Sequence, residues 1–125
     1  MESKTVLIVD DEMSNTQLFG MMLELEGYRP VAAVDEPTAL EALRQQTPDV
    51  MIVDVMLPGA SGLDLCRKVR NELGLADLPI VIVSAKSQLA DVQAGVAAGA
   101  TVYLTKPVTK AELLGAVRQA VGEGE

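Results

Sequence analysis

The chain of 125 residues contains no histidine and no tryptophan, and it has a single cysteine. Histidine is the commonest general base and transition-metal ligand, so its absence excludes serine–histidine hydrolases and histidine-built zinc sites. The lone Cys66 cannot form an internal disulfide, and its apolar helical surroundings predict a small buried side chain rather than a nucleophile. Any bound metal is therefore expected to be a hard cation with oxygen ligands.

Basic residues are also scarce: 10 Lys and Arg face 18 Asp and Glu, which gives a formal net charge of -8. Nucleic acids and anionic membranes are bound by clustered Lys and Arg, so neither is an expected partner of this chain alone. The sequence has no signal-peptide pattern and no run of the roughly 20 apolar residues that a membrane helix needs. With 49% hydrophobic residues, the length suits one compact domain, which we expect to be cytoplasmic.

The sequence does contain five short apolar runs rich in β-branched residues. Each run predicts a strand, and continuously apolar runs are typical of strands covered on both faces. The predicted strands span residues 5–9, 30–34, 50–53, 79–83 and 101–104. Segments with helical spacing follow each of them, so the strict alternation predicts a doubly wound α/β fold with a parallel sheet.

Helix starts are indicated by capping residues, and the last start forms a capping box with Glu112. The predicted starts are Ser14, Asp35, Ser61, Ser87 and Thr109, and Gly27 is expected to end the first helix. The expected apolar stripes, in helix order, are Leu18, Met22 and Leu25; Leu40 and Leu43; Leu63, Cys66 and Val69; Leu89, Val92 and Val96; and Leu113, Leu114, Val117 and Val121. Arg67, Lys68 and Arg70 are expected to face solvent. The fourth helix, over 87–98, contains Gly95 and is expected to be the most mobile.

Polar side chains follow four of the strands at their carboxyl ends, where open parallel sheets bind ligands. These residues are Asp10, Asp11 and Glu12; Asp54; Ser84; and Thr105, Lys106 and Pro107. Three crowded carboxylates oppose one another's ionisation unless a cation is present, so the pattern predicts Mg2+ together with the Lys106 ammonium. Glu12 is expected to cap the first helix or to face solvent rather than to bind metal.

The motifs at these positions resemble the receiver domain of bacterial two-component response regulators. They are Asp10-Asp11, Asp54 followed by Met-Leu-Pro-Gly-Ala-Ser-Gly at 56–62, Ser84-Ala85, and Tyr103-Leu-Thr-Lys106-Pro107. The resemblance runs from Thr5 to Val121 and implies a flavodoxin-like (βα)5 fold with sheet order 2-1-3-4-5. Residues 1–121 would form the domain, and 122–125 would be a short Gly/Glu tail or the start of a linker.

The resemblance also implies a role for each site residue. Asp54 would be the phosphoacceptor, and Mg2+, or Mn2+ in its place, would be held by Asp10, Asp11, Asp54 and the backbone carbonyl of Met56. Ser84, Lys106 and Tyr103 would bind the phosphoryl group and switch the domain. Structural support would come from Pro58, Gly59, Gly62 and Pro107, with a cis bond between Lys106 and Pro107.

The function implied is a phosphorylation-dependent signalling switch, not an enzyme beyond its own phosphotransfer and autodephosphorylation. The phosphoryl donor would be a sensor histidine kinase or a histidine phosphotransfer protein, because this chain has no histidine of its own. The surface of the fourth helix, fifth strand and fifth helix would control an unknown output partner or attached domain. Many DNA-binding relatives carry an acidic pair just before the aromatic residue and often Phe after Lys-Pro. Here these positions hold Thr101, Val102 and Val108, so a charged dimer through this surface is in doubt.

Two alternatives stay open from the residues. One is a Mg2+-dependent phosphohydrolase with an aspartate nucleophile. Such enzymes usually carry a second aspartate two residues later as general acid, where this chain has Met56. The other is a phosphorylation-independent scaffold with a receiver fold, which the intact set of polar site residues disfavours.

Overall fold

The computed structural model describes residues 3–122. The predicted tail at 122–125 therefore lies, apart from Gly122, outside the described residues. The strands are β1 (Thr5–Val9), β2 (Arg29–Ala33), β3 (Val50–Val53), β4 (Met56–Leu57), β5 (Ala60–Ser61), β6 (Ile80–Ser84) and β7 (Val102–Thr105). The helices are α1 (Met13–Leu25), α2 (Glu36–Gln45), α3 (Gly62–Asn71), α4 (Leu89–Ala97) and α5 (Lys110–Val121). None of the helices in the described part is long and apolar enough to cross a membrane.

Five strands form one parallel sheet in the order β2-β1-β3-β6-β7. The short strands β4 and β5 pair with each other as a separate antiparallel hairpin. Without that hairpin, the strands of the main sheet have the predicted order 2-1-3-4-5, so the predicted fold is confirmed. The strands of the main sheet begin or end within one residue of their predicted bounds.

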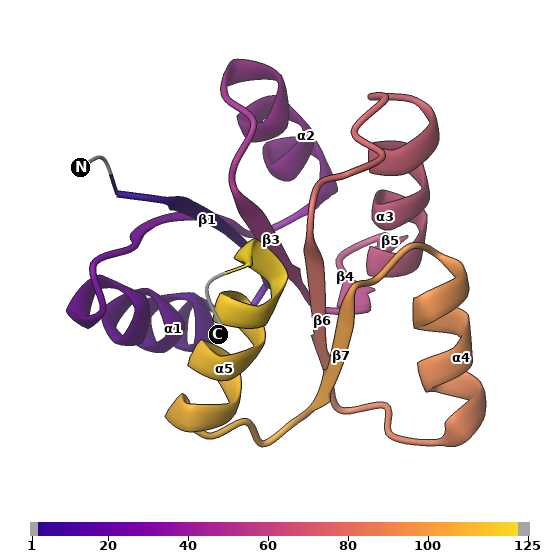
Figure 1. Ribbon diagram of the computed structural model, residues 1–125. Coiled ribbons are helices and arrows are strands. Elements are labelled where there is room, and N and C mark those ends of the chain that lie inside the picture. Colours follow the sequence, from indigo (N-terminus) through magenta and orange to yellow (C-terminus); the bar gives the residue numbers. More distant parts are fainter. Residues whose placement is uncertain (1–2, 123–125) are drawn as a thin grey trace.

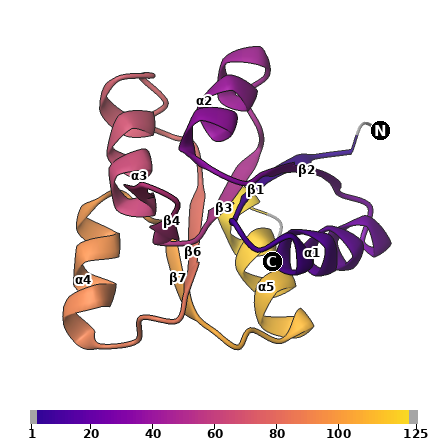
Figure 2. The ribbon, with the colours of Figure 1, turned by 180° about the vertical axis from the view of Figure 1, so that it is seen from behind.

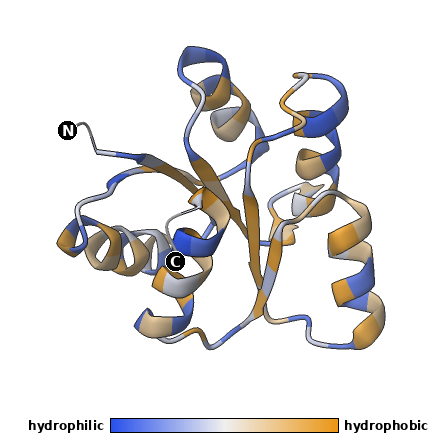
Figure 3. Ribbon diagram, in the orientation of Figure 1, coloured by the Kyte–Doolittle hydropathy of each residue, from blue (hydrophilic) through white to orange (hydrophobic). Residues whose placement is uncertain are grey.

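Helices cover both faces of the sheet, with α1 and α5 on one face and α2, α3 and α4 on the other (Figures 1 and 2). The central strands β1, β3 and β6 are buried along their whole length, and hydrophobic residues run along the sheet in Figure 3. β2 lies at the edge and exposes 38% of Val31. The continuously apolar runs thus mark the central strands that need cover on two sides.

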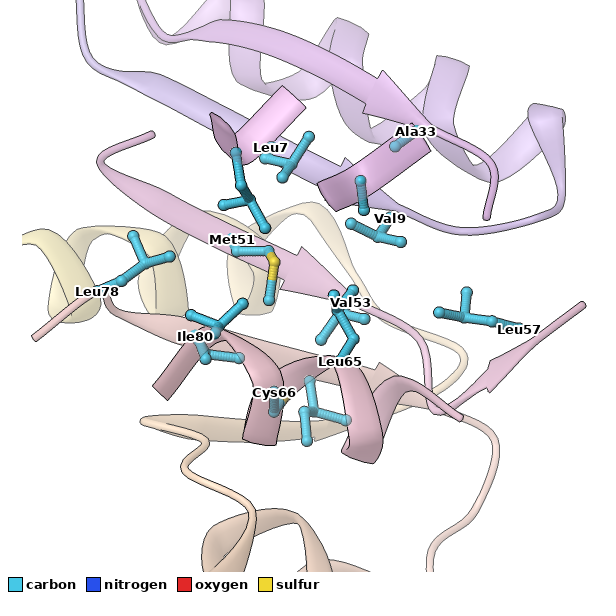
Figure 4. Packing of buried hydrophobic residues seen from close by; sticks show 14 of the residues in the cluster. Leu7, Val9, Ala33, Met51, Val53, Leu57, Leu65, Cys66, Leu78 and Ile80 are labelled. Atoms are coloured by element: carbon cyan, nitrogen blue, oxygen red, sulfur yellow. The ribbon is translucent and has the colours of Figure 1, made fainter. Parts of the chain in front are cut away.

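Each face of the sheet has its own hydrophobic core. Toward α2 and α3, the labelled side chains of Figure 4 pack together from the main sheet, the β4 strand, α3 and the loop before β6: Leu7, Val9, Ala33, Met51, Val53, Leu57, Leu65, Cys66, Leu78 and Ile80. Toward α1 and α5, the buried residues include Val6, Ile8, Phe19, Leu23, Ile52, Val81, Leu113 and Val117. Cys66 is fully buried, as predicted, and burial raises the pKa of its thiol to about 11.

Three predicted helix caps are confirmed. The Asp35 carboxylate accepts a hydrogen bond from the Thr38 backbone N–H at 2.9 Å. The Ser61 hydroxyl accepts one from the Leu63 N–H at 3.1 Å. Thr109 and Glu112 form the predicted reciprocal capping box, with bonds of 2.9 and 3.1 Å. Caps are determined by residues close in sequence, which explains why they could be predicted.

The prediction for α1 was wrong in two respects. The helix begins at Met13, so Ser14 lies inside it instead of capping it. Its buried face consists of Thr16, Phe19, Gly20 and Leu23, whereas the expected stripe residues Leu18 and Leu25 are 48% and 73% exposed. Apolar residues occur around the whole helix, so spacing alone did not distinguish the two faces.

The prediction for α4 was also wrong about which residues face the core. The helix begins at Leu89, two residues after Ser87. Leu89 and Val96, expected to face inward, are 72% and 59% exposed, and Gly95 is the buried residue of the helix. The close approach of the Tyr103 ring, described below, requires the small residue on the inner face.

Arg70 does not face solvent as expected. Its guanidinium donates hydrogen bonds to the backbone carbonyls of Leu75 and Gly99 at 2.9 and 2.6 Å, and to that of Leu78. These bonds connect the end of α3 to the loop before β6 and to the loop after α4. Arg70 therefore connects two loops that the sequence separates widely.

Candidate functional site

The carboxyl ends of the sheet strands bring together three of the predicted site residues. The Lys106 Nζ lies 2.7 Å from Asp54 Oδ2 and 3.2 Å from Asp10 Oδ2. Asp10 follows β1, Asp54 follows β3 and Lys106 follows β7, so the contact joins residues up to 96 positions apart. Two of the three predicted carboxylates, those of Asp10 and Asp54, thus surround the Lys106 amine.

Both carboxylates are nearly buried, with Asp10 3% and Asp54 8% exposed as whole residues. Burial opposes the charged form of Lys106, but the hydrogen bond and charge of Asp54, followed by those of Asp10, outweigh it and raise the pKa of the ammonium. Lys106 is therefore positively charged near neutral pH. Two buried carboxylates share this one ammonium, which leaves negative charge that a cation would offset.

The segment after Asp54 holds its carboxylate in place. The Met56 backbone N–H donates to Asp54 Oδ1 at 3.0 Å. A Cβ at Gly62 would lie 2.1 Å from the Asp54 carbonyl oxygen, so only glycine fits where α3 begins. Pro58 and Gly59 form the turn between β4 and β5, and Gly59 has a φ of 64°, which glycine adopts without strain.

The Asp10 carboxylate also accepts bonds from the start of α1. Its Oδ1 accepts the Glu12 backbone N–H at 2.9 Å, and its Oδ2 accepts the Asn15 side-chain amide at 3.2 Å. The same amide nitrogen of Asn15 lies 3.3 Å from Glu12 Oε1. Glu12 occupies the N-cap position of α1, but its side chain does not cap the helix.

Ser84 and Tyr103 are linked through the backbone of Lys86. The Lys86 N–H donates to the Ser84 hydroxyl at 3.2 Å, and the Tyr103 hydroxyl donates to the Lys86 carbonyl at 2.7 Å. Ser84 is fully buried at the end of β6. Burial, together with the charges of Asp91 and Asp54, raises the pKa of Tyr103 although its contact with Ser84 acts in the opposite direction.

The Tyr103 ring lies directly against α4 at Gly95. A Cβ built at Gly95 would be 2.7 Å from Tyr103 Cδ2 and 3.1 Å from Ile82 Cδ1. The missing side chain of Gly95 thus leaves the space that the ring occupies, which is a feature the sequence analysis did not identify.

The remaining predicted residues are placed as follows. Asp11 is exposed beside Asp10, and the Met56 side chain is 61% exposed. Pro107 follows Lys106 through a cis peptide bond, as the resemblance implies. Among residues 3–122, no group of three or more Asp, Glu, Cys or His side chains is arranged to hold a metal ion. Metal binding by Asp10, Asp11, Asp54 and the Met56 carbonyl therefore stays a prediction.

Asn15 is another site residue that the sequence analysis missed. Its signal was its spacing, five residues after Asp10 and three after Glu12, which places its amide over both carboxylates once α1 begins at Met13. With the helix start predicted at Ser14, the sequence analysis did not place the Asn15 amide near Asp10 and Glu12.

Comparisons with known proteins identify the family to which the chain belongs. A family model described as response regulator receiver domain matches residues 6–118. The chain is 38% identical over 113 residues to the DNA-binding response regulator MtrA of Mycolicibacterium paratuberculosis, covering 90% of this chain and 49% of that protein. It is 35% identical over 128 residues to the phosphate regulon transcriptional regulatory protein PhoB of Pseudomonas aeruginosa, covering 100% of this chain and 56% of that protein.

The fold agrees with solved structures as well. The chemotaxis response regulator CheY4 of Vibrio cholerae superposes with a TM-score of 0.88 at 30% identity, covering 94% of this chain and 98% of that chain. The chain spans about half the length of the curated relatives it matches. It belongs to the response regulator receiver domains, whose standard role is that of a phosphorylation-dependent switch in two-component signalling.

Proposed function

We propose that Asp54 is the phosphoacceptor of this switch and that a phosphohistidine in a sensor kinase or histidine phosphotransfer protein is the donor. The observation that carries the proposal is the Lys106 ammonium, 2.7 Å from Asp54 and 3.2 Å from Asp10 at the open edge of the sheet. A buried carboxylate beside a fixed cation is a nucleophile placed where transferred negative charge can be stabilised.

The transfer replaces one bond to phosphorus by another. A carboxylate oxygen of Asp54 forms a bond to phosphorus while the phosphorus–nitrogen bond of the donor breaks, and the bonding electrons return to the imidazole. Two negative groups must approach each other in this step, so positioning and positive charge account for most of its acceleration. Lys106 supplies charge at the Asp54 carboxylate, and the Met56 N–H keeps that carboxylate in a fixed orientation.

The donor chemistry of the site fits Mg2+, which prefers oxygen ligands and retains several waters. Asp10, Asp11, Asp54 and the Met56 carbonyl would hold the ion, and Mn2+ could substitute. When bound, it supplies the additional positive charge that the phosphoryl group needs. The excess of carboxylate over ammonium charge at Asp10, Asp54 and Lys106 supports this assignment.

Ser84 and Tyr103 are the residues proposed to report phosphorylation to the surface. The Ser84 hydroxyl can donate to a phosphoryl oxygen while it accepts the Lys86 N–H, so the loop would follow the new bond. The Tyr103 hydroxyl is bonded to the same residue of that loop. Movement of the loop would thus change the position of the ring against α4, and with it the surface of α4, β7 and α5 that faces an output partner or domain.

The domain is proposed to work in the cytoplasm and without binding nucleic acid itself. The net charge of -8 supports the absence of nucleic-acid binding, because DNA binding depends on clustered basic residues. DNA binding in the named relative MtrA belongs to that protein, of which the matched part is 49%.

The test is phosphorylation by acetyl phosphate with Mg2+, followed by intact-mass spectrometry. Wild-type protein should gain one phosphoryl group, and Asp54→Ala should gain none while keeping its fold. Asp64→Ala serves as the matched control, because Asp64 is an exposed carboxylate paired with Arg67 on α3. An adduct of equal yield in Asp54→Ala, or no adduct in the wild type, would contradict the proposal.

A further inference from the structure

Asp10 has an amide neighbour that the proposed phosphotransfer does not use. Asn15 donates from one amide nitrogen to Asp10 Oδ2 at 3.2 Å and to Glu12 Oε1 at 3.3 Å. Only the amide NH2 can satisfy two carboxylates at once, so the orientation of the Asn15 side chain follows from its surroundings. Asp10 is 3% exposed, which leaves few other donors able to reach it.

A role for Asn15 in stabilising α1 itself does not explain this contact. The side chain acts as a donor to carboxylates, whereas a helix N-terminus is capped by acceptors that receive its free N–H groups. Asparagine also has a lower helix propensity than alanine or leucine. At this position in α1, asparagine therefore destabilises the helix slightly, while its amide provides a hydrogen bond to the Asp10 carboxylate.

We propose that Asn15 is a positioning residue for the divalent cation, holding the Asp10 carboxylate in its working orientation together with Lys106. This inference rests on the proposed function. Both Asn15 and Lys106 donate to Asp10 Oδ2, each at 3.2 Å. If Lys106 turns toward a phosphoryl oxygen, its bond to Asp10 lengthens, and Asn15 keeps the carboxylate in place.

The expected size of the effect follows from the bond lengths. Residues that orient metal ligands typically change metal affinity by about 10- to 100-fold. The Asn15 amide is shared and both of its bonds are long for N–H···O contacts. The effect of its loss should therefore lie at or below the lower limit of this range, with Mg2+ affinity reduced about five- to tenfold.

The experiment is a titration of the unphosphorylated protein with Mg2+ by isothermal calorimetry, with no phosphoryl donor present. Asn15→Leu keeps the size of the side chain and removes its donors, and Asn15→Ala is a second variant in case leucine packs poorly. Gln17→Leu is the matched control, since it makes a similar change at an exposed position of the same helix. Both Asn15 variants should bind Mg2+ five- to tenfold more weakly, and Gln17→Leu should bind as the wild type does.

Two further measurements separate positioning from a structural role. The Asn15 variants should melt within about 3 °C of the wild type without Mg2+, because the helix itself does not need the amide. In phosphorylation by acetyl phosphate, the Mg2+ concentration for half-maximal rate should rise about as much as the dissociation constant, while the rate at saturating Mg2+ stays within about twofold.

Glu12→Ala shows whether Asn15 affects Mg2+ affinity through Asp10 or through Glu12. If Asn15 acts through Asp10, loss of the Glu12 side chain should change Mg2+ affinity less than about twofold. Unchanged affinity in both Asn15 variants would overturn this inference and leave the proposed function intact, as would a Glu12→Ala effect equal to that of Asn15→Leu. A wild type that binds no Mg2+ would overturn both proposals.

Discussion

α3 and α4 cover the same face of the sheet, but they are held there very differently. Leu65, Cys66 and Val69 of α3 are 0% exposed. The buried residue of α4 is Gly95, and its large side chains Leu89 and Val96 are mostly exposed. A helix with little buried apolar surface costs less to move than one in the core. The difference supports the proposal that α4 is the element that responds to phosphorylation while α3 stays in place.

The two ends of α4 differ as well. After its C-terminal end, the Gly99 carbonyl accepts a bond from Arg70 of α3. Before its N-terminal end, the loop that follows β6 accepts a hydrogen bond from the Tyr103 hydroxyl at the Lys86 carbonyl. The C-terminal end is thus tied to the fixed helix, while the N-terminal end is connected to the residues proposed to sense the phosphoryl group.

The largest contrast is expected between leucines of the two helices. Leu65→Ala removes a fully buried side chain and should lower the free energy of unfolding by about 2–5 kcal/mol. Leu89→Ala removes one that is 72% exposed and should change it by less than about 0.5 kcal/mol. Urea unfolding measures both values. Comparable losses would mean that α4 is packed as firmly as α3.

The free energy of unfolding at alkaline pH should report the burial of the Cys66 thiol in α3. Burial raises the pKa of this thiol from 9.0 to about 11, so the folded protein keeps a proton that the unfolded chain releases. Unfolding then releases a proton between about pH 9 and pH 11, and stability falls as pH rises through this range, by about 2–3 kcal/mol. Urea midpoints at pH values across the range measure the slope, which should be shallower in Cys66→Ala. Equal slopes would contradict the buried thiol.

Arg70 should be worth more to stability than its neighbour Arg67. Arg70→Leu leaves the carbonyls of Leu75, Leu78 and Gly99 without their guanidinium partner and should cost about 2 kcal/mol. Arg67→Leu removes an exposed ion pair with Asp64 and should cost less than about 0.5 kcal/mol. Hydrogen exchange of the amides at 99–101 should accelerate only in Arg70→Leu. Equal stability losses and equal exchange rates in the two variants would mean that the bonds of Arg70 to the loop after α4 do not stabilise the protein.

Replacing Gly95 and Gly115 by alanine should change the stability of the protein in opposite directions. Gly95→Ala places a Cβ 2.7 Å from the Tyr103 ring, so the crowding should outweigh the better helix propensity and cost about 1 kcal/mol. Gly115→Ala in α5 has no atom within 4 Å of the new Cβ and should stabilise by up to about 1 kcal/mol. Thermal unfolding gives the signs, and Tyr103 ring resonances show whether the ring moves. Stabilisation by Gly95→Ala would contradict the packing of the ring.

The parts of the fold that were predictable depend on neighbours in sequence or on strand burial. The caps at Asp35, Ser61 and Thr109 are local, and the apolar runs of β1, β3 and β6 reflect cover on both faces. The order of the sheet came from the family resemblance. Strand ends then placed Asp10, Asp54 and Lys106 at one edge, where the structure brings them together.

The parts that were missed depend on partners distant in sequence. Arg70 looks like a solvent-facing residue until the loops at 75–78 and 99 are folded against it. Gly95 looks like a weak point of a helix until the Tyr103 ring is placed. The apolar face of α1 was misassigned because its hydrophobic residues surround the helix, and packing against the sheet and α5 selects Phe19 and Leu23.

Backbone amide NMR can show whether occupation of Asp54 is transmitted through Ser84 and Tyr103 to α4 while α3 stays in place. Spectra of the protein with Mg2+ are compared before and after addition of beryllofluoride, with Asp54→Ala as the control. Shifts are expected at 84–98 and 102–105, with little change at 64–73 in and after α3 and no change in Asp54→Ala. Shifts of α3 as large as those of α4, or the same shifts in Asp54→Ala, would contradict this expectation.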